Sequence, residues 1–136
     1  MFKAKDIMET KVICIRPEMP IYEAIRLLPR SNLSDLPVVD KNLRPLGILS
    51  EKDVFQLLYD MDVKTNFKVK DYMNPFIKTF DVKDSLIELC DCLRSFSFRR
   101  IPITQDGMLV GMITPNNIIE TILKMKSQDN KKKKAV

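Results

Sequence analysis

The chain of 136 residues contains no histidine. Without an imidazole, the Ser-His and Cys-His nucleophile pairs and the histidine ligands of zinc enzymes are excluded. The three cysteines, Cys14, Cys90 and Cys92, are an odd number and do not resemble a disulfide framework, which is typical of a reducing cytoplasm. The commonest designs of hydrolases and zinc enzymes are therefore excluded, and we expect neither catalytic residues nor a metal site.

Long apolar runs are also missing. No stretch approaches the roughly 18 to 20 apolar residues of a membrane-spanning helix, and residues 1–6 lack the apolar core of a signal peptide. We therefore expect a soluble, cytoplasmic protein without a membrane partner.

The net charge of +5 is concentrated at one end of the chain. Residues 124–136 hold six lysines and one aspartate, which leaves 17 basic and 17 acidic residues in the rest. The body is formally neutral and offers no broad basic surface to nucleic acid. Residues 125–136 are predicted to form a disordered, lysine-rich tail. Because no aromatic residue stands between its lysines to stack on bases, we do not expect nucleic-acid binding.

The sequence contains an internal duplication. The first matches lie 65 residues apart, and after a one-residue deletion in the second copy the offset becomes 64. The matches are 5–8 with 70–73, Pro37 with Pro102, Gly47 with Gly111, Ser50 with Thr114, and Asp53 with Asn117. We divide the chain into copy one (1–61), a linker (62–69), copy two (70–124) and the tail (125–136).

Each copy is predicted to fold as β-α-β-β-α, which makes the chain a mixed α/β protein. Short runs rich in branched apolar residues predict the strands: 12–15, 36–39 and 46–49 in copy one, and 77–80, 101–104 and 109–113 in copy two. One copy alone would leave a face of three short strands uncovered and would be marginally stable. Packing two copies about a pseudo-twofold axis buries that face and creates two clefts, where we expect ligands.

Two helices are predicted in each copy. The first begins at Ile21 in copy one, where Pro29 should end or kink it, and after the Ser85 cap in copy two. The second covers 51–61 in copy one and 115 to about 126 in copy two. Cys90 and Cys92 fall on a predicted helix, where residues two apart do not face each other, so we interpret them as apolar filling.

Three short motifs recur in both copies. They are Asp-Ile-Met at 6–8, Leu-Pro-Val-Val-Asp at 36–40 and Gly-Ile-Leu-Ser-Glu-Lys-Asp at 47–53, with counterparts at 71–73, 101–103 and 111–117. This series resembles a tandem cystathionine-beta-synthase (CBS) domain pair, or Bateman module, over residues 3 to about 123. The resemblance implies that adenosine-containing ligands bind between the repeats and that two chains pair into a disk-shaped homodimer through their helices.

The residue types around Ser50 also suit a nucleotide in their own right. Gly47 permits close backbone approach, and Ser50 stands at a predicted helix start that favours phosphate. Asp53, one turn later, would accept hydrogen bonds from two ribose hydroxyls. Apolar walls for adenine would come from Val12, Ile13, Leu36 and Pro37.

The two copies differ in the residues before the proline, which in the family often add phosphate contacts. Arg99 and Arg100 precede Pro102, whereas Ser34 and Asp35 hold the aligned positions before Pro37. Arginine forks suit phosphate oxygens, and an aspartate would repel them. The preferred phosphate-bearing site therefore combines the Ser50 and Asp53 motif with the two arginines. Adjacent strand residues point to opposite faces, so only one arginine would enter the cleft fully. The alternatives are that both arginines are solvated or that Arg100 pairs with a carboxylate across the repeat interface.

The second cleft offers Thr114 and Asn117, with Ile101 and Pro102 as its apolar wall, but no pair of cations. In the family the aspartate of this motif holds ribose and the serine or threonine reaches toward phosphate. Asn117 is thus a candidate ribose ligand and Thr114 a candidate phosphate ligand. The cleft would be empty or would take a less charged ligand such as a nucleoside or S-adenosylmethionine.

The Ser50 and Thr114 tetrads have a simpler interpretation as helix caps. Both interpretations hold together, because a capped helix start is also an anion site. The sequence favours a non-catalytic sensor, without an enzyme cofactor, that binds AMP, ADP or ATP and signals occupancy to a protein partner it does not identify. The alternative is a structural module with vestigial clefts, tethered by its lysine tail to nucleic acid or another acidic surface.

Overall fold

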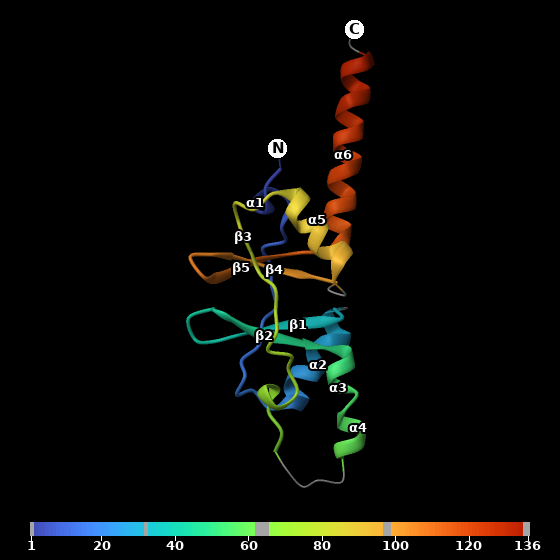
Figure 1. The fold of residues 1–136 in the computed structure, drawn as a ribbon. Helices are drawn as coiled ribbons and strands as arrows, with labels where there is room; N and C mark the ends of the chain where they lie inside the picture. Colours follow the sequence, from blue (N-terminus) through green and yellow to red (C-terminus); the bar gives the residue numbers. More distant parts are fainter. Residues whose placement is uncertain (1, 32, 62–65, 97–98, 135–136) are drawn as a thin grey trace. The chain divides into compact units, whose positions relative to one another are not determined.

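The computed structural model describes residues 2–31, 33–61, 66–96 and 99–134, with backbone only for 31 and 131–134. The chain divides into two compact units (Figure 1). Unit 1 comprises Met1–Lys11, Thr79–Gln105 and Val110–Val136, and unit 2 comprises Val12–Lys78 and Asp106–Leu109.

Unit 2 carries the helices and strands of copy one after its opening segment, followed by the opening turn of copy two. In chain order these are α2 (Ile21–Ser31), β1 (Asp35–Val39), β2 (Pro45–Ser50), α3 (Glu51–Val54), α4 (Leu57–Asp60) and the 3-10 turn η1 (Val69–Asp71). Strands β1 and β2 pair antiparallel, with a register shift between Val38 and Val39. The carboxylate of Asp40 shapes the turn between them by accepting hydrogen bonds from the backbone N–H groups of Asn42 and Arg44, at 2.8 and 2.9 Å.

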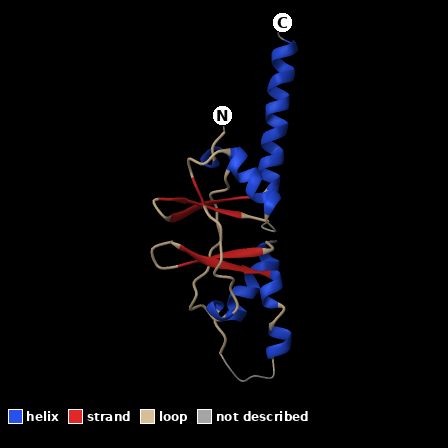
Figure 2. Cartoon of the chain, viewed as in Figure 1, coloured by secondary structure: helices blue, strands red, loops and turns tan. Residues whose placement is uncertain are grey.

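Unit 1 carries one helix from the opening of copy one and the later elements of copy two. They are α1 (Ala4–Ile7), β3 (Phe80–Asp81), α5 (Leu86–Ser95), β4 (Ile101–Gln105), β5 (Met108–Ile113) and α6 (Pro115–Lys134). The sheet order is β3-β4-β5, with β3 parallel to β4, and Figure 2 shows these strands and the β1-β2 pair as two separate sheets. Asp106 and Gly107 join β4 to β5 with φ values of 53° and 80°, the pair of positive angles that a type I′ hairpin turn requires.

The two hydrophobic cores use equivalent positions of the two copies. Ile21, Ala24, Leu36, Val38, Leu49 and Val69 in unit 2 correspond to Leu86, Leu89, Ile101, Ile103, Ile113 and Ala4 in unit 1. Full burial of one such leucine or isoleucine side chain contributes about 1.5–3 kcal/mol. The predicted fold class and its duplication are therefore confirmed at the level of individual core residues.

The opening segment of each copy packs in the unit of the other copy. In unit 1 the Ala4 N–H donates to the carbonyl oxygen of Asp84 at 2.8 Å, and in unit 2 the Val69 N–H donates to that of Met19 at 2.9 Å. Ala4 and Val69 are 65 positions apart, so the same contact occurs twice with the segments exchanged. The spatial units therefore do not coincide with the copies defined by sequence.

The first predicted strand of each copy is shorter than expected. Residues 12–15 contribute one parallel bridge, from Ile15 to Val38, and in copy two the strand is β3 alone. Pro17 follows Ile15 closely and has no N–H with which to continue a ladder. The four strands predicted in the two hairpins are confirmed as β1, β2, β4 and β5.

The predicted helices also differ in extent. The helix expected over 51–61 is divided into α3 and α4, because the N–H groups of Leu58 and Tyr59 donate three residues back, to Phe55 and Gln56, at 3.1 and 3.0 Å. Helix α2 continues past Pro29, so an early end there is wrong; the proline lies in the last turn, where its missing N–H removes a single hydrogen bond.

Helix α6 continues to Lys134, through the segment expected to be a disordered tail. Over the described ranges, no helix combines the length and the apolar character needed to cross a bilayer.

Candidate functional site

The motif of copy one lies at the start of α3, where Ser50 is the N-cap. The backbone N–H and the hydroxyl of Ser50 both donate to Oδ2 of Asp53, at 2.8 and 2.9 Å. The Asp53 N–H donates back to Ser50 Oγ at 3.3 Å. Among the described residues, Oδ1 of Asp53 receives no recorded hydrogen bond and is available as an acceptor.

The motif of copy two repeats this geometry at the start of α6. The N–H and the hydroxyl of Thr114 donate to Oδ1 of Asn117, at 2.8 and 3.1 Å, and the Asn117 N–H donates back to Thr114 Oγ1 at 3.2 Å. The side-chain amide of Asn117 donates from Nδ2 to Oε1 of Glu9 at 3.2 Å. A carboxylate thus lies beside this motif although the motif itself has none.

The helix-cap interpretation of both motifs is confirmed. Each hydroxyl has one proton, and in both motifs that proton goes to the side chain three residues on. For Ser50 or Thr114 to donate to a phosphate, this internal hydrogen bond would have to be given up. What the copy-one motif offers a ligand directly is the second carboxylate oxygen of Asp53.

The glycine before each motif makes room for the chain itself. A Cβ on Gly47 would lie 2.5 Å from the carbonyl oxygen of Asn74, and one on Gly111 would lie 2.9 Å from that of Glu9. The exchanged opening segments form backbone bridges at these points, Asn74 with Ile48 and Glu9 with Met112. Gly47 was expected to let a nucleotide approach the backbone closely. In the structure, the space beside each glycine is filled by the exchanged opening segment.

The residues expected to form the adenine walls have different surroundings. Leu36 and Ile101 are 0% and 1% exposed, because their strands direct them into the two cores. Pro37 and Pro102 are also buried. Ile13, at 41% exposed, and the half-buried Val12 are the accessible apolar side chains of this set.

The two arginines before Pro102 are unlike each other. Arg99 is exposed, whereas Arg100 is 7% exposed. Adjacent residues next to a strand are expected to point to opposite faces, so that one side chain is exposed and the other is buried. Arg99 therefore has the guanidinium that a solvent-borne anion reaches without rearrangement.

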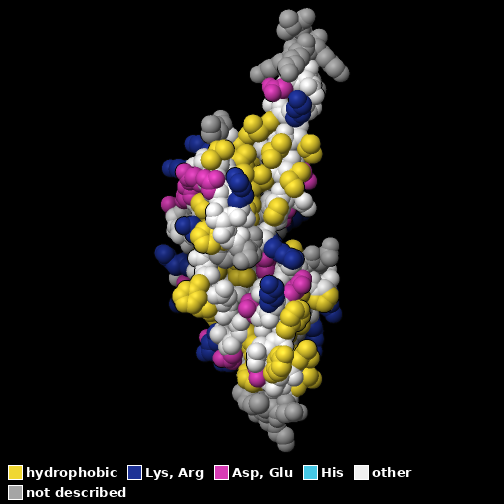
Figure 3. All heavy atoms as spheres, turned by 45° about the vertical axis from the view of Figure 1, so that its right-hand side comes forward, with side chains coloured by type: hydrophobic (Ala, Val, Ile, Leu, Met, Phe, Trp, Pro, Cys, Tyr) yellow, Lys and Arg dark blue, Asp and Glu magenta, His cyan; other side chains and the backbone are white. Residues whose placement is uncertain are grey.

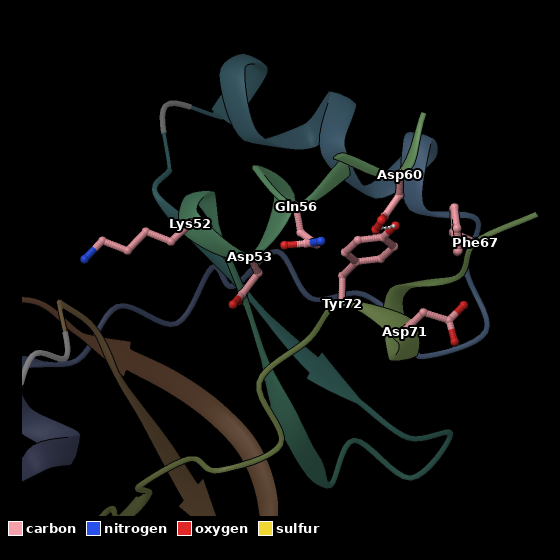
Figure 4. Close-up of a pocket in the computed structure, with 7 residues that line it drawn as sticks. All are labelled: Lys52, Asp53, Gln56, Asp60, Phe67, Asp71 and Tyr72. Carbon is pink, nitrogen blue, oxygen red and sulfur yellow. Dashed lines mark hydrogen bonds between the residues drawn. The ribbon is translucent and has the colours of Figure 1, made fainter. Parts of the chain in front are cut away.

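A hollow of about 370 Å³ lies within unit 2 next to the copy-one motif. It is lined by Lys52, Asp53, Gln56, Asp60, Phe67, Asp71 and Tyr72. Figure 4 shows the Asp53 carboxylate and the Lys52 ammonium group pointing away from the Tyr72 and Asp60 pair. Asp53 is the one predicted site residue in this lining.

Tyr72 organises the far side of this hollow. Its hydroxyl donates to Oδ2 of Asp60 at 2.8 Å, and its ring meets that of Phe67 edge-on with the centroids 5.3 Å apart. Desolvation by burial, followed by the hydrogen bond to Asp60, raises the pKa of Tyr72 to about 12. Tyr72 is therefore a neutral hydrogen-bond donor throughout the physiological range.

Within the described residues, no group of three or more histidine, cysteine, aspartate and glutamate side chains is arranged to hold a metal ion. The cysteines there are free, and burial raises the pKa of the Cys90 thiol.

Comparison with known proteins identifies the duplicated unit. The CBS domain model matches twice, at residues 4–60 and 69–124. The chain belongs to the CBS domain family. A 17.7 kDa protein of Acidianus ambivalens is 27% identical over 122 residues, which are 89% of this chain and 73% of that protein. A protein of Methanocaldococcus jannaschii is also 27% identical, but the match spans only 42% of its length.

Solved CBS pairs have the same fold. CBSX2 of Arabidopsis thaliana, solved in complex with AMP, is 25% identical with a TM-score of 0.82, over 93% of this chain and 99% of that one. The CBS domain pair of protein MJ0100, solved with 5-methylthioadenosine and S-adenosyl-L-methionine, is 20% identical with a TM-score of 0.77, over 92% and 98% of the two chains. The second likeness shows the fold alone.

Glu9 is absent from the site residues expected from sequence, although a signal for it exists. The offset of 65 aligns Glu9 with Asn74, and both residues bridge to the strand that leads into a motif, Glu9 to Met112 and Asn74 to Ile48. Carrying the alignment one residue past the shared Met8 and Met73 pairs Glu9 with Asn74, and the structure then places each of them beside a motif.

Proposed function

We propose that this chain is a non-catalytic regulatory module that binds an adenine nucleotide and conveys its occupancy to a protein partner. The observation that carries the proposal is the free Oδ1 of Asp53, held in place by the Ser50 cap, in a chain 25% identical to a CBS pair solved with AMP. A fixed carboxylate oxygen is a suitable acceptor for a ribose hydroxyl.

In this proposal the copy-one motif binds ribose through Asp53. The phosphate binds to the arginines that precede Pro102, with exposed Arg99 as the first contact and Arg100 as the second. Support comes from the bidentate geometry of guanidinium and phosphate. The copy-two motif has no such cations in its aligned positions, Ser34 and Asp35, and takes a ligand of lower charge such as a nucleoside or S-adenosylmethionine.

We also propose that the module functions as a homodimer formed through its helices. Large apolar side chains are exposed on helices of each unit, and Figure 3 shows hydrophobic side chains on the surface of each unit. They are Leu58 (74%) and Tyr59 (81%) on α4, and Ile119 (52%), Ile122 (54%) and Leu123 (62%) on α6. A second copy of the chain, with the same apolar faces, would cover them. The dimer then has two packing arrangements, and the ligand shifts the equilibrium toward the arrangement that it binds more tightly.

Thermal unfolding with a panel of AMP, ADP, ATP, adenosine and S-adenosylmethionine tests the proposal. A ligand present at 100 times its Kd stabilises the folded state by about 2.7 kcal/mol, so at least one adenine nucleotide should raise the Tm by several degrees. Asp53→Asn combined with Arg99→Ala should reduce the shift, whereas Arg26→Ala, an exposed arginine on α2, should leave it unchanged. An unchanged Tm across the whole panel would refute the proposal.

The alternative function, a structural module tethered by its lysine-rich end, predicts a different result. Binding to RNA or another polyanion would weaken steeply with salt and would be lost on truncation after Lys126, while no small molecule would change the Tm. Polyanion binding by the truncated chain and the Tm with the ligand panel therefore distinguish the two functions.

A further inference from the structure

The two copies carry one carboxylate and one carboxamide each, at exchanged positions. In unit 2 the motif ends in Asp53 and the bridging residue is Asn74, whereas in unit 1 the motif ends in Asn117 and the bridging residue is Glu9. The bridges themselves match. The Ile48 and Asn74 N–H groups donate to each other's carbonyl oxygens at 2.9 and 2.8 Å, and those of Met112 and Glu9 both do so at 2.9 Å.

The hydrogen bonds of Asn117 leave it without a free acceptor. Its Oδ1 accepts from the N–H and the hydroxyl of Thr114, which uses both lone pairs. The other terminal atom is Nδ2, which only donates, and it donates to Glu9. In copy one the corresponding atom is Oδ1 of Asp53, which is a free acceptor among the described residues.

A ribose diol needs such an acceptor, because each of its hydroxyls carries a proton to donate. In unit 1 the carboxylate that lies against the motif is that of Glu9. Its side chain is exposed, and within the described part of the chain it forms no ion pair. Its Oε2 receives no recorded hydrogen bond there, so it is free to accept one.

We propose that Glu9 is the ribose-binding acceptor of copy two and replaces the carboxylate that Asn117 lacks. This inference rests on the proposed function and names a ligand-binding residue for its second site. The amide of Asn117 positions the Glu9 carboxylate through the 3.2 Å hydrogen bond. The uncharged probe for this site is adenosine, which presents the diol without a phosphate.

The test is isothermal titration calorimetry with adenosine on the full chain carrying Asp53→Asn. This substitution removes the ribose acceptor of copy one and weakens that site. It keeps the cap, because an asparagine fills this cap position in copy two. In that background, Glu9→Gln should weaken adenosine binding about tenfold or more, the usual cost of a hydrogen bond to a charged group. Glu9→Asn with Asn117→Asp, which recreates the arrangement of copy one, should restore it to within about threefold.

A second ligand makes the role of Glu9 specific. With 2′,3′-dideoxyadenosine, binding in the Asp53→Asn background should be about tenfold weaker, and Glu9→Gln should cause no additional loss. A melting curve checks that Glu9→Gln folds, which is expected because its side chain is exposed and its bridge uses the backbone.

The outcomes separate this inference from the proposed function. Adenosine binding in the Asp53→Asn background that is unaffected by Glu9→Gln overturns the role of Glu9 and leaves the function intact. Loss of all adenosine binding with Asp53→Asn alone also overturns it, because copy two then holds no nucleoside. A wild-type chain that binds neither adenosine nor any adenine nucleotide overturns both.

Discussion

Ser50 and Asp53 close the start of α3 together, and they use only one oxygen of the Asp53 carboxylate to do so. Oδ2 receives both hydrogen bonds from Ser50, at 2.8 and 2.9 Å. One side chain thus serves both the fold and the proposed ligand, since its second oxygen faces no recorded donor among the described residues. The structural and the binding roles of Asp53 are therefore separable by mutation.

Asp53→Asn and Asp53→Ala should separate these roles. The asparagine retains an acceptor for Ser50, as Asn117 does for Thr114, so its free energy of unfolding should change little while AMP binding weakens about tenfold. The alanine also removes the acceptor of the Ser50 N–H and hydroxyl and should be destabilised by about 1 kcal/mol. Chemical denaturation and calorimetry of both variants check this. Equal AMP affinity in the wild type and the asparagine variant would exclude Asp53 as a ligand residue.

Gly47→Ala should destabilise the fold by about 1–3 kcal/mol. The added Cβ would lie 2.5 Å from the carbonyl oxygen of Asn74, a backbone atom held in the bridge to Ile48. Gly111→Ala is the matched control. Its Cβ would also lie 2.5 Å from a neighbour, but that neighbour is the side-chain sulfur of Met8, which can move, and the nearest backbone atom is at 2.9 Å. Urea denaturation should show a larger loss for Gly47→Ala, and the reverse order would contradict the bridge as the cause.

Because of Tyr72, the free energy of unfolding should fall as the pH rises above 10. Its pKa is raised from 10.0 to about 12 in the folded chain, so the folded state holds the phenolic proton more tightly than the unfolded state. The contribution is fully present below pH 10 and is lost as the pH rises toward 12. Tyr72→Phe should remove this component and should also cost about 1 kcal/mol at neutral pH through loss of the hydrogen bond to Asp60.

The measurement for Tyr72 is the difference in unfolding free energy between the wild type and Tyr72→Phe from pH 8 to pH 12, which cancels the titration of lysines. A difference between the wild type and Tyr72→Phe that stays constant above pH 10 would show that the phenol has an ordinary pKa.

Leu58→Asp and Leu123→Asp should each convert a homodimer into monomers without unfolding the chain. Both leucines are exposed, at 74% and 62%, so an aspartate there costs little in a monomer and much in a dimer interface, where a charge would be desolvated. Sedimentation velocity measures the change. Lys83→Asp, an exposed substitution outside these helix faces, is the control. A wild-type chain that is monomeric at high concentration would refute the dimer.

Much of the fold was predictable because each helix and strand occurs twice in the sequence, so its residue pattern could be compared between the two copies. The two hairpins, the Ser85 cap and the Asp106-Gly107 turn follow from local residue types. Periodicity does not state which copy a segment packs against, so the exchange of Ala4 and Val69 between the units could not be predicted. It also cannot tell an inward strand residue such as Leu36 from one that lines a ligand surface.

The candidate site was predictable in its motifs but not in its hydrogen bonds. The spacing of Ser50 and Asp53 predicted both a cap and a ligand contact, and only the geometry shows that the hydroxyl proton is used within the motif. Glu9 lies 108 positions from Asn117, and their 3.2 Å hydrogen bond depends on the exchanged segment. A contact of this kind is visible only after the fold is known.

Native mass spectrometry of the purified protein, titrated with AMP to about 1 mM, tests the central claim most directly because it reports subunit number and bound ligand together. The account predicts a dimer that retains AMP, with clearly lower occupancy in the Asp53→Asn variant. A wild-type chain that carries no AMP at any concentration, with the same spectrum for Asp53→Asn, would contradict it.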